Sequence, residues 1–193
     1  MVYKYMKKLV VSLVACGILA GCSSMRIEDF ADEMPQLVLE EYFNGRLTAY
    51  GVIKDRRGRI TSSFRADFVG SWDEDGLGTL DEVFVYNDGV VQERVWTFRP
   101  VEDNRYIGTA EDIVGESDMV VNGNTLRMDY VIRVPYRNRT IDLTVQDWLH
   151  LQPDGVMLNH SYMRKFGIRV AELVVTIIKD FPAEAEEGDT IDE

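Results

Sequence analysis

The sequence predicts an all-β protein, an antiparallel up-and-down β-barrel of about eight to ten strands preceded by a short N-terminal helix. Two observations lead to this prediction. After Gly45 the chain is a succession of short β-type runs separated by turn residues, with no helical period between them. Asn87-Asp88-Gly89 joins two of these runs and is the clearest hairpin signal in the chain. A closed barrel of about this many strands has room for one small ligand.

The N-terminus has the pattern of an export signal for a lipoprotein. Three lysines precede an apolar run from Leu9 to Leu19, and the run leads into Leu19-Ala20-Gly21-Cys22. A run of about eleven residues is too short to span a bilayer, which needs roughly 20. Residues 1–21 are therefore predicted to be a lipoprotein signal peptide and Cys22 to be the lipidated residue. A secretory signal without lipid, or a buried helix, is the alternative.

The predicted position in the cell follows from Cys22 and the residue after it. Acyl chains such as palmitate on Cys22 would make the membrane a partner of the protein. Ser23 follows Cys22, where an Asp would retain a lipoprotein in the inner membrane. We therefore expect an outer-membrane lipoprotein that faces the periplasm. Cys16 lies inside the predicted signal, so the mature chain has no thiol pair for a disulfide.

The composition argues against a nucleic-acid partner. The signal peptide removes three of the 21 basic residues and none of the 33 acidic ones, so the mature chain carries a net charge of −15. A surface of this charge repels phosphate backbones. The 172 remaining residues suit one exported domain.

Before the barrel we expect a tether and a helix. Residues 22–34 are polar and mixed, and are predicted to be a lipidated tether. Pro35 then begins a segment with apolar residues at 38, 39, 42 and 43, which ends at Asn44-Gly45. Proline in the first turn and glycine after the last turn are typical of a short helix. Such a helix can close one end of a barrel.

The predicted barrel domain spans residues 35–181, and its turns contain Gly, Asn, Asp or Pro. An acidic tail, residues 182–193, is predicted to be disordered because it has little to bury. The predicted strands are the runs 47–54, 60–72, 77–86, 90–99, 105–114, 118–121, 125–134, 140–151, 156–166 and 171–181.

Alternation along these runs predicts which polar side chains face the interior. If the aromatic ring of Trp96 faces inward, so does Arg94, two residues before it. By the same test Glu82 faces inward together with Phe84 and Tyr86. Glu82 and Arg94 lie on adjacent strands of one hairpin and are the natural ion pair.

Two further acids are predicted to face inward. Asp147 alternates with Leu143 and Val145, and Asp112 alternates with Tyr106. Charged residues are rarely buried unless they are paired. The predicted polar network of the cavity is Glu82, Arg94, Asp112 and Asp147, and the predicted cavity aromatics are Phe84, Tyr86, Trp96 and Tyr106.

Three interpretations of this network remain open. The charges could form a structural network that fixes the register, or a polar cavity floor that binds the head of an amphipathic ligand. A carboxylate pair could also act as general acid and base. No catalytic residue, metal ligand or cofactor is assigned, because His150 and His160 lie on different runs and the chain has neither G-x-S-x-G nor a glycine-rich phosphate loop.

The chain resembles an uncharacterised family of bacterial lipoproteins from about Phe43 to Phe181. The motifs that carry the resemblance are Tyr42-Phe43-Asn44-Gly45, the segment from Leu80 to Gly89, Arg94-Val95-Trp96, Asp147-Trp148, and the segment from Asn159 to Gly167. The resemblance implies a lipocalin-like barrel, and genes of this family often lie beside those of cyclopropane-fatty-acid-synthase-like enzymes. It implies a role near membrane lipid modification and no established catalytic residues.

From these observations we expect a membrane-anchored lipoprotein that binds or carries a lipid or another apolar small molecule. A structural or interaction lipoprotein of the cell envelope is the alternative. An enzyme that acts on a lipid-like substrate through the interior carboxylates is the third possibility.

Overall fold

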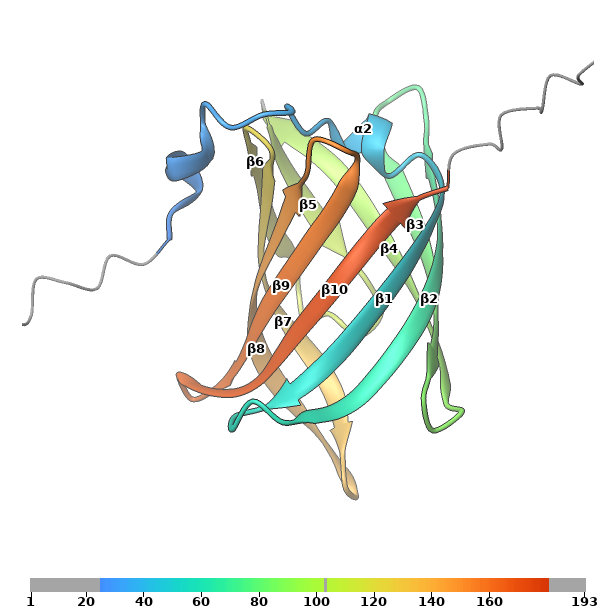
Figure 1. Ribbon diagram of the computed structural model, residues 1–193, viewed down its shortest axis with the longest axis vertical. Coiled ribbons are helices and arrows are strands. Elements are labelled where there is room, and N and C mark those ends of the chain that lie inside the picture. Colours follow the sequence, from blue (N-terminus) through green and yellow to red (C-terminus); the bar gives the residue numbers. More distant parts are fainter. Residues whose placement is uncertain (1–24, 103, 181–193) are drawn as a thin grey trace, which may run out of the picture.

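The computed structural model describes residues 25–102 and 104–180, which form a closed antiparallel barrel of ten strands (Figure 1). This confirms the predicted all-β fold. The elements are η2 (Ile27–Phe30), α2 (Leu39–Tyr42), β1 (Gly45–Asp55), β2 (Ile60–Trp72), β3 (Gly78–Tyr86), β4 (Val91–Glu102), β5 (Arg105–Thr109), β6 (Ser117–Asn122), β7 (Thr125–Tyr136), β8 (Arg139–Leu151), β9 (Val156–Lys165) and β10 (Ile168–Lys179).

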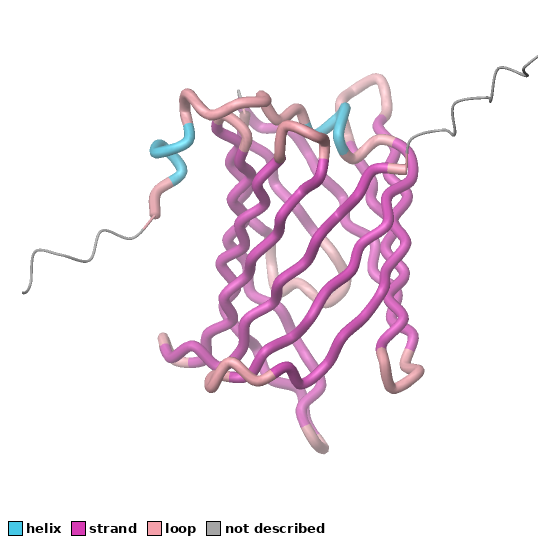
Figure 2. The backbone as a smooth tube through the Cα atoms, in the orientation of Figure 1, coloured by secondary structure: helices cyan, strands magenta, loops and turns pink. Residues whose placement is uncertain are grey.

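The strands form an up-and-down meander in which each one pairs with the next along the chain. Pairing of β1 with β10, from Leu47 opposite Lys179 to Asp55 opposite Ala171, closes the barrel. Loops and turns lie mostly at the two ends (Figure 2). At the predicted hairpin turn, Gly89 has φ 86°, a conformation that glycine adopts without a steric penalty. Closure leaves neither β1 nor β10 as an open sheet edge of the kind that an exposed β-structure must otherwise protect.

One predicted strand is shorter than the run that suggested it. The run 105–114 gives β5 only as far as Thr109, and a loop of residues 110–116 follows. The loop main chain bonds to β7 instead: Val114 N–H donates to Val131 O at 2.8 Å, and Arg133 N–H donates to Asp112 O at 2.7 Å. Asp112 therefore lies on a loop and not on a strand.

The short helix α2 lies over one end of the barrel, as predicted (Figure 1). It covers four residues, fewer than the segment from residue 35 to 43 that suggested it, because Leu37 N–H bonds across to Gly123 O at 2.8 Å. Tyr42 donates its hydroxyl proton to Ile177 O on β10 at 3.1 Å. Leu39 and Phe43 are buried, so the helix seals this end with apolar side chains.

The segment before α2 lies on the outer face of the barrel. Asn122 Nδ2 donates to Ile27 O at 3.1 Å, and the Phe30 ring packs 6.0 Å from the Trp148 ring. Residues 25–34 of the predicted tether are thus placed against strands, whereas Cys22 and the tail 182–193 lie outside the described residues. None of the helices in the described ranges is long and apolar enough to cross a membrane.

The core fills the barrel from the α2 end downward, because inward-facing positions alternate with exposed ones along each strand. Burial of each large apolar side chain contributes about 1.5–3 kcal/mol. The core includes Leu39, Phe43, Leu47, Phe64, Phe68, Leu80, Phe84, Trp96, Phe98, Met119, Leu126, Met128, Leu143, Val145, Leu149, Met157, Val175 and Ile177.

Candidate functional site

A cavity of about 100 Å³ lies inside the barrel beneath α2. Its wall is mostly apolar and aromatic, with a few charged and polar side chains that converge on it. The residues that line it are Leu39, Phe43, Phe64, Phe68, Leu80, Glu82, Phe84, Arg94, Trp96, Phe98, Met119, Leu126, Met128, Tyr130, Asp147, Leu149, Asn159, Leu173 and Val175.

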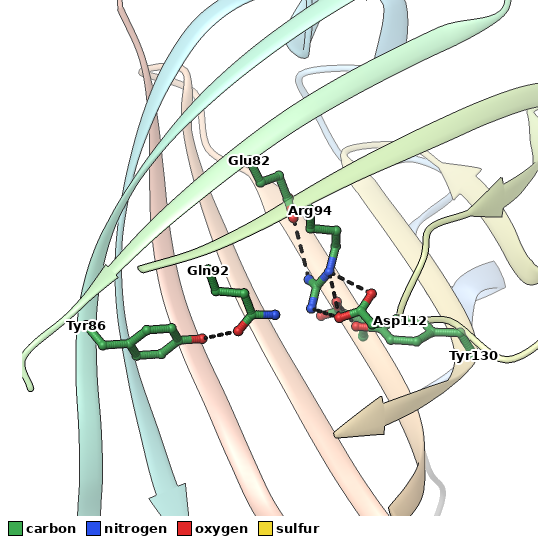
Figure 3. A network of polar contacts seen from close by, with 7 residues as sticks. Glu82, Tyr86, Gln92, Arg94, Asp112 and Tyr130 are labelled. Atoms are coloured by element: carbon green, nitrogen blue, oxygen red, sulfur yellow. Dashed lines mark hydrogen bonds and ion pairs between the residues drawn. The ribbon is translucent and has the colours of Figure 1, made fainter. Parts of the chain in front are cut away.

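Arg94 is the centre of the polar part of the site (Figure 3). Its Nε and Nη2 donate to the Asp112 carboxylate at 3.0 and 2.7 Å, which makes a bidentate ion pair. Its Nη1 is 3.5 Å from Glu82 Oε2, a longer contact. Glu82 and Arg94 are directly opposite in the β3–β4 register, as the alternation predicted. Arg94 thus bridges two carboxylates that come from a strand and from a loop.

Two aromatic rings hold the guanidinium in place. Arg94 Cζ lies 5.6 Å from the centroid of the Phe84 ring and 6.0 Å from that of Trp96. Cation–π contacts at such distances contribute about 0.5–2 kcal/mol. The rings and the two carboxylates therefore fix the guanidinium between the apolar cavity and the loop.

Asp147 is buried on β8 and is held by neutral donors. Ser161 Oγ donates to its Oδ1 at 2.6 Å, Asn159 Nδ2 donates to the same oxygen, and Tyr130 Oη donates to Oδ2 at 3.2 Å. Asn159 Nδ2 also contacts Trp148 O at 3.1 Å. Within the described ranges, no Lys or Arg side chain lies within ion-pair distance of this carboxylate.

The electrostatics of the interior are dominated by desolvation. Burial raises the pKa of Glu82 to about 7, with the Asp112 and Asp147 charges adding to the effect and Arg94 opposing it. Burial also raises the pKa of Asp147, although the bonds from Ser161 and Asn159 lower it. For Arg94, burial would lower the pKa, but Glu82 and Asp112 outweigh it and raise the pKa. Glu82 and Asp112 thus share the Arg94 guanidinium, whereas Asp147 is held by neutral donors.

The structure brings together most of the predicted polar residues, but not every predicted aromatic. Glu82, Arg94, Asp147, Phe84 and Trp96 line the cavity. The other three predicted residues do not: Asp112 reaches Arg94 from its loop, Tyr86 Oη donates to Gln92 Oε1 at 3.2 Å, and Tyr106 Oη donates to Glu40 Oε1 at 2.8 Å. The bond to Glu40 holds Tyr106 at the α2 end, away from the polar cluster.

Sequence reasoning missed the partners of Asp147. Tyr130, Asn159 and Ser161 all lie at inward positions of β7 and β9. The same alternation test could have found them, because Tyr130 follows Met128 and Asn159 follows Met157 at a spacing of two. Being uncharged, they were not singled out as buried ionisable groups.

The two histidines lie on the outer face. His150 Nδ1 is 2.8 Å from Thr125 Oγ1, and His160 Nε2 is 2.9 Å from Glu172 Oε1. Among the described residues, no group of three or more His, Cys, Asp or Glu side chains is placed to hold a metal ion.

Comparison with known proteins gives a family and a fold. Residues 16–179 match the family described as "Protein of unknown function (DUF3833)", so the chain belongs to that family. No curated protein matches the sequence. The structure is similar to that of the S-type phycobiliprotein lyase from Guillardia theta, with a TM-score of 0.55 and 9% identity over 82% of this chain and 94% of the lyase. The barrel is therefore lipocalin-like.

Proposed function

We propose that this member of the family is a binding protein for a small apolar or amphipathic molecule, which it holds inside the barrel. The observation that carries the proposal is Glu82. Its side chain is 9% exposed and lines an apolar cavity, and only Oε2 has a partner. Oε1 has no hydrogen-bond donor among the described residues. Oε1 is not one of the fully enclosed unpaired polar atoms of the described residues, which are Ser117 Oγ and Arg127 Nε, so it keeps accessible surface and can accept a charge-assisted hydrogen bond from a ligand donor.

The ligand head that suits this wall is neutral or cationic and donates hydrogen bonds. Arg94 already serves Asp112 and Glu82, so it has little capacity left for a third carboxylate. The carboxylates of Glu82, Asp112 and Asp147 would repel an anionic head, because the interior is shielded from water. A ligand with an apolar body and a hydroxyl or amine at one end would pack against the aromatic wall and donate a hydrogen bond to Glu82.

The cavity volume limits the part of the ligand that it can enclose. About 100 Å³ is below the 300–1,000 Å³ of ordinary ligand pockets and is closer to an engineered cavity that binds benzene. A longer lipid tail requires side chains to move. Met119 and Met128 line the cavity, and methionine changes rotamer at low cost. The lipid that we propose as cargo would therefore enlarge the cavity as it enters.

The anchor and the location belong to the same proposal. Lipid on Cys22 would hold the barrel at the periplasmic face of the outer membrane, where membrane lipids are available as a source of ligand, and the proposal includes a link to membrane fatty-acid modification. The support is the Leu19-Ala20-Gly21-Cys22 motif and the preceding apolar run.

The experiment compares three probes of one shape: protonated benzylamine, benzyl alcohol and benzoate. The readout is the NMR shift of the Trp96 indole N–H at pH 8, with Trp72 and Trp148 as internal references because neither lines the cavity. We expect benzylamine and benzyl alcohol to shift Trp96, and benzoate to leave it unchanged. Glu82→Gln should remove the preference for the amine and retain the alcohol. A shift by benzoate equal to that of benzylamine would disprove the assignment of the head group.

Native mass spectrometry of the protein purified from its own membrane tests the wider proposal. We expect a co-purifying small molecule in the wild type and a loss of it in Leu80→Trp, which would fill the cavity. The control is Val83→Trp on the outer face of the same strand, because Val83 is exposed. The absence of any bound molecule from wild-type protein in its native membrane would contradict ligand binding.

A structural role without a ligand is the second candidate. It is favoured by the completeness of the pairing at Arg94 and Asp147, whose polar contacts are made within the protein. In that case the cluster fixes strand register, and the Trp96 indole responds to none of the three probes.

A further inference from the structure

The end of the barrel opposite α2 carries three neighbouring turns that are rich in Lys and Arg (Figure 1, lower end). They join β1 to β2, β7 to β8, and β9 to β10. Because β8 pairs with β9 and β10 pairs with β1, these turns follow one another around the rim. We call this surface the basic rim, and define it by residues 54–60, 133–139 and 164–169.

The basic rim concentrates positive charge on an acidic protein. It contains ten of the 21 Lys and Arg residues in a chain whose net charge is −12. Six of the ten have no carboxylate within ion-pair distance in the described part of the chain: Arg56, Arg57, Arg137, Arg139, Arg164 and Lys165.

The acids near the rim are already engaged. Asp55 pairs with Arg59 at 2.6 Å, and Asp142 pairs with Arg133 at 2.8 Å. Glu172 pairs with Lys54 at 3.0 Å. Asp88 lies on the adjacent β3–β4 turn, where its Oδ1 accepts from Val90 N–H. The rim therefore presents a positive surface to an approaching anion.

Exposed apolar side chains stand among these charges. Phe166 is 91% exposed at the tip of the β9–β10 turn, and Ile168, Ile60 and Tyr136 are also exposed. Lys165 Nζ lies 5.0 Å from the Phe166 ring and donates to Asp142 O at 2.6 Å. The combination of free cations and protruding apolar tips is typical of surfaces that enter the interface of a bilayer.

Phe166 lies at a turn position whose backbone conformation favours a different residue type. Its φ is 51° and that of Gly167 is 78°, so both central residues of the turn are left-handed. Such turns prefer Asn-Gly, and a bulky side chain there is an outlier. With its ring 91% exposed, Phe166 gains little packing energy beyond its contact with Lys165 to offset this conformation. A function that uses the exposed ring accounts for its presence.

We propose that the basic rim docks the protein on an anionic lipid bilayer, with Phe166 inserted among the headgroups and the free arginines against lipid phosphates. Charge complementarity selects this occupant: a surface rich in anionic lipid attracts Lys and Arg by about fivefold in affinity per residue. The protruding apolar tips favour a bilayer over a hydrated nucleic acid. Docking by this rim turns the barrel end that α2 does not cover toward the membrane.

The test is cosedimentation with vesicles of residues 22–193, the chain without the predicted signal peptide, whose lysines and apolar run would themselves bind a bilayer. All proteins carry Cys22→Ser, so that no acyl chain contributes. One set of vesicles contains phosphatidylcholine only, and the other contains phosphatidylcholine with about one third phosphatidylglycerol. We expect binding to the anionic vesicles alone and a strong loss of binding at high salt. Equal binding to both vesicles would overturn the proposal, and so would binding to RNA without binding to anionic vesicles.

Two variants locate the docking surface. Arg56→Gln with Arg57→Gln removes two free charges and should weaken vesicle binding by about twenty-fivefold. The control, Arg46→Gln with Arg105→Gln, removes the same formal charge away from the rim, where Arg105 is paired with Asp118 at 2.9 Å, and should leave the affinity within about twofold of its original value. Phe166→Asn should weaken binding severalfold without lowering the melting temperature, because asparagine suits the turn. Equal effects of the two charge pairs, or unchanged binding by Phe166→Asn, would contradict the proposal.

Discussion

Arg94 on β4 is bound to Asp112 in the β5–β6 loop through both Nε and Nη2, at 3.0 and 2.7 Å. The Arg94 side chain is 15% exposed and that of Asp112 is 23% exposed. The pair is thus partly shielded from water, and its charges depend on each other. Glu82 is the secondary partner of Arg94, at 3.5 Å.

Arg94→Met should destabilise the protein by about 3 kcal/mol, because it leaves two carboxylates in the interior without their cation. Adding Glu82→Gln and Asp112→Asn should restore stability to within about 1 kcal/mol of the wild type, since an uncharged set needs no counter-ion. Urea unfolding of the single, double and triple variants measures the coupling. Small and additive losses would show that the charges do not interact.

Glu82 should make the free energy of unfolding fall as the pH rises. Its folded pKa of about 7 exceeds the ordinary value of 4.5, so the folded state binds the proton more tightly. The resulting stabilisation is fully present below about pH 4.5 and is lost as the pH passes through 7, a change of up to about 3 kcal/mol. Urea unfolding at pH 5 and pH 8 should show a smaller difference for Glu82→Gln than for the wild type. Identical pH profiles would contradict the burial of this carboxyl.

Gly70→Ala should loosen the α2 end. A Cβ at Gly70 would lie 1.6 Å from Phe43 O, so the main chain after α2 must move. We expect a loss of about 2 kcal/mol or more in the free energy of unfolding. The neighbouring exposed change Ser71→Ala is the control and should cost less than about 1 kcal/mol. Equal thermal shifts for the two variants would mean that α2 is not held by this contact.

Cys22→Ala should abolish acylation, because Cys22 is the predicted lipid-bearing residue. Labelling of cells with a palmitate analogue provides the measurement. Cys16→Ala is the matched control, since Cys16 lies inside the predicted signal peptide and its loss should leave the label in place. Label that persists in Cys22→Ala would refute the anchor.

The strand pattern was predictable because alternation and turn chemistry are local properties. Asn87-Asp88-Gly89 sets the β3–β4 register, and that register places Glu82 opposite Arg94. The inward position of Asp147 followed from the same alternation. These features depend on residues close together in the sequence, so no knowledge of the assembled barrel was needed.

The remaining features depend on contacts between distant segments. Asp112 reaches Arg94 because its loop bonds to β7, which local patterns cannot reveal. Tyr106 has the alternation of an inward-facing residue, but its hydroxyl donates a hydrogen bond to Glu40, which is 66 residues away in sequence. The basic rim brings together three turns from distant parts of the chain. Barrel closure is what makes them neighbours.

Because β5 and β6 are short, one part of the barrel wall is held by fewer main-chain hydrogen bonds than the rest. Pairing of β4 with β5 begins at Thr97, and among the described residues no main-chain bond joins Val91–Val95 to the 110–116 loop. Between β4 and this loop, the Arg94–Asp112 side-chain pair takes the place of the main-chain hydrogen bonds that join neighbouring strands elsewhere in the barrel. Salt weakens the attraction between side-chain charges, whereas it has little effect on main-chain hydrogen bonds. Lateral opening therefore costs least here, and deuterium should reach those amides of Val91–Val95 that do not bond to β3 before the paired amides of the neighbouring strands.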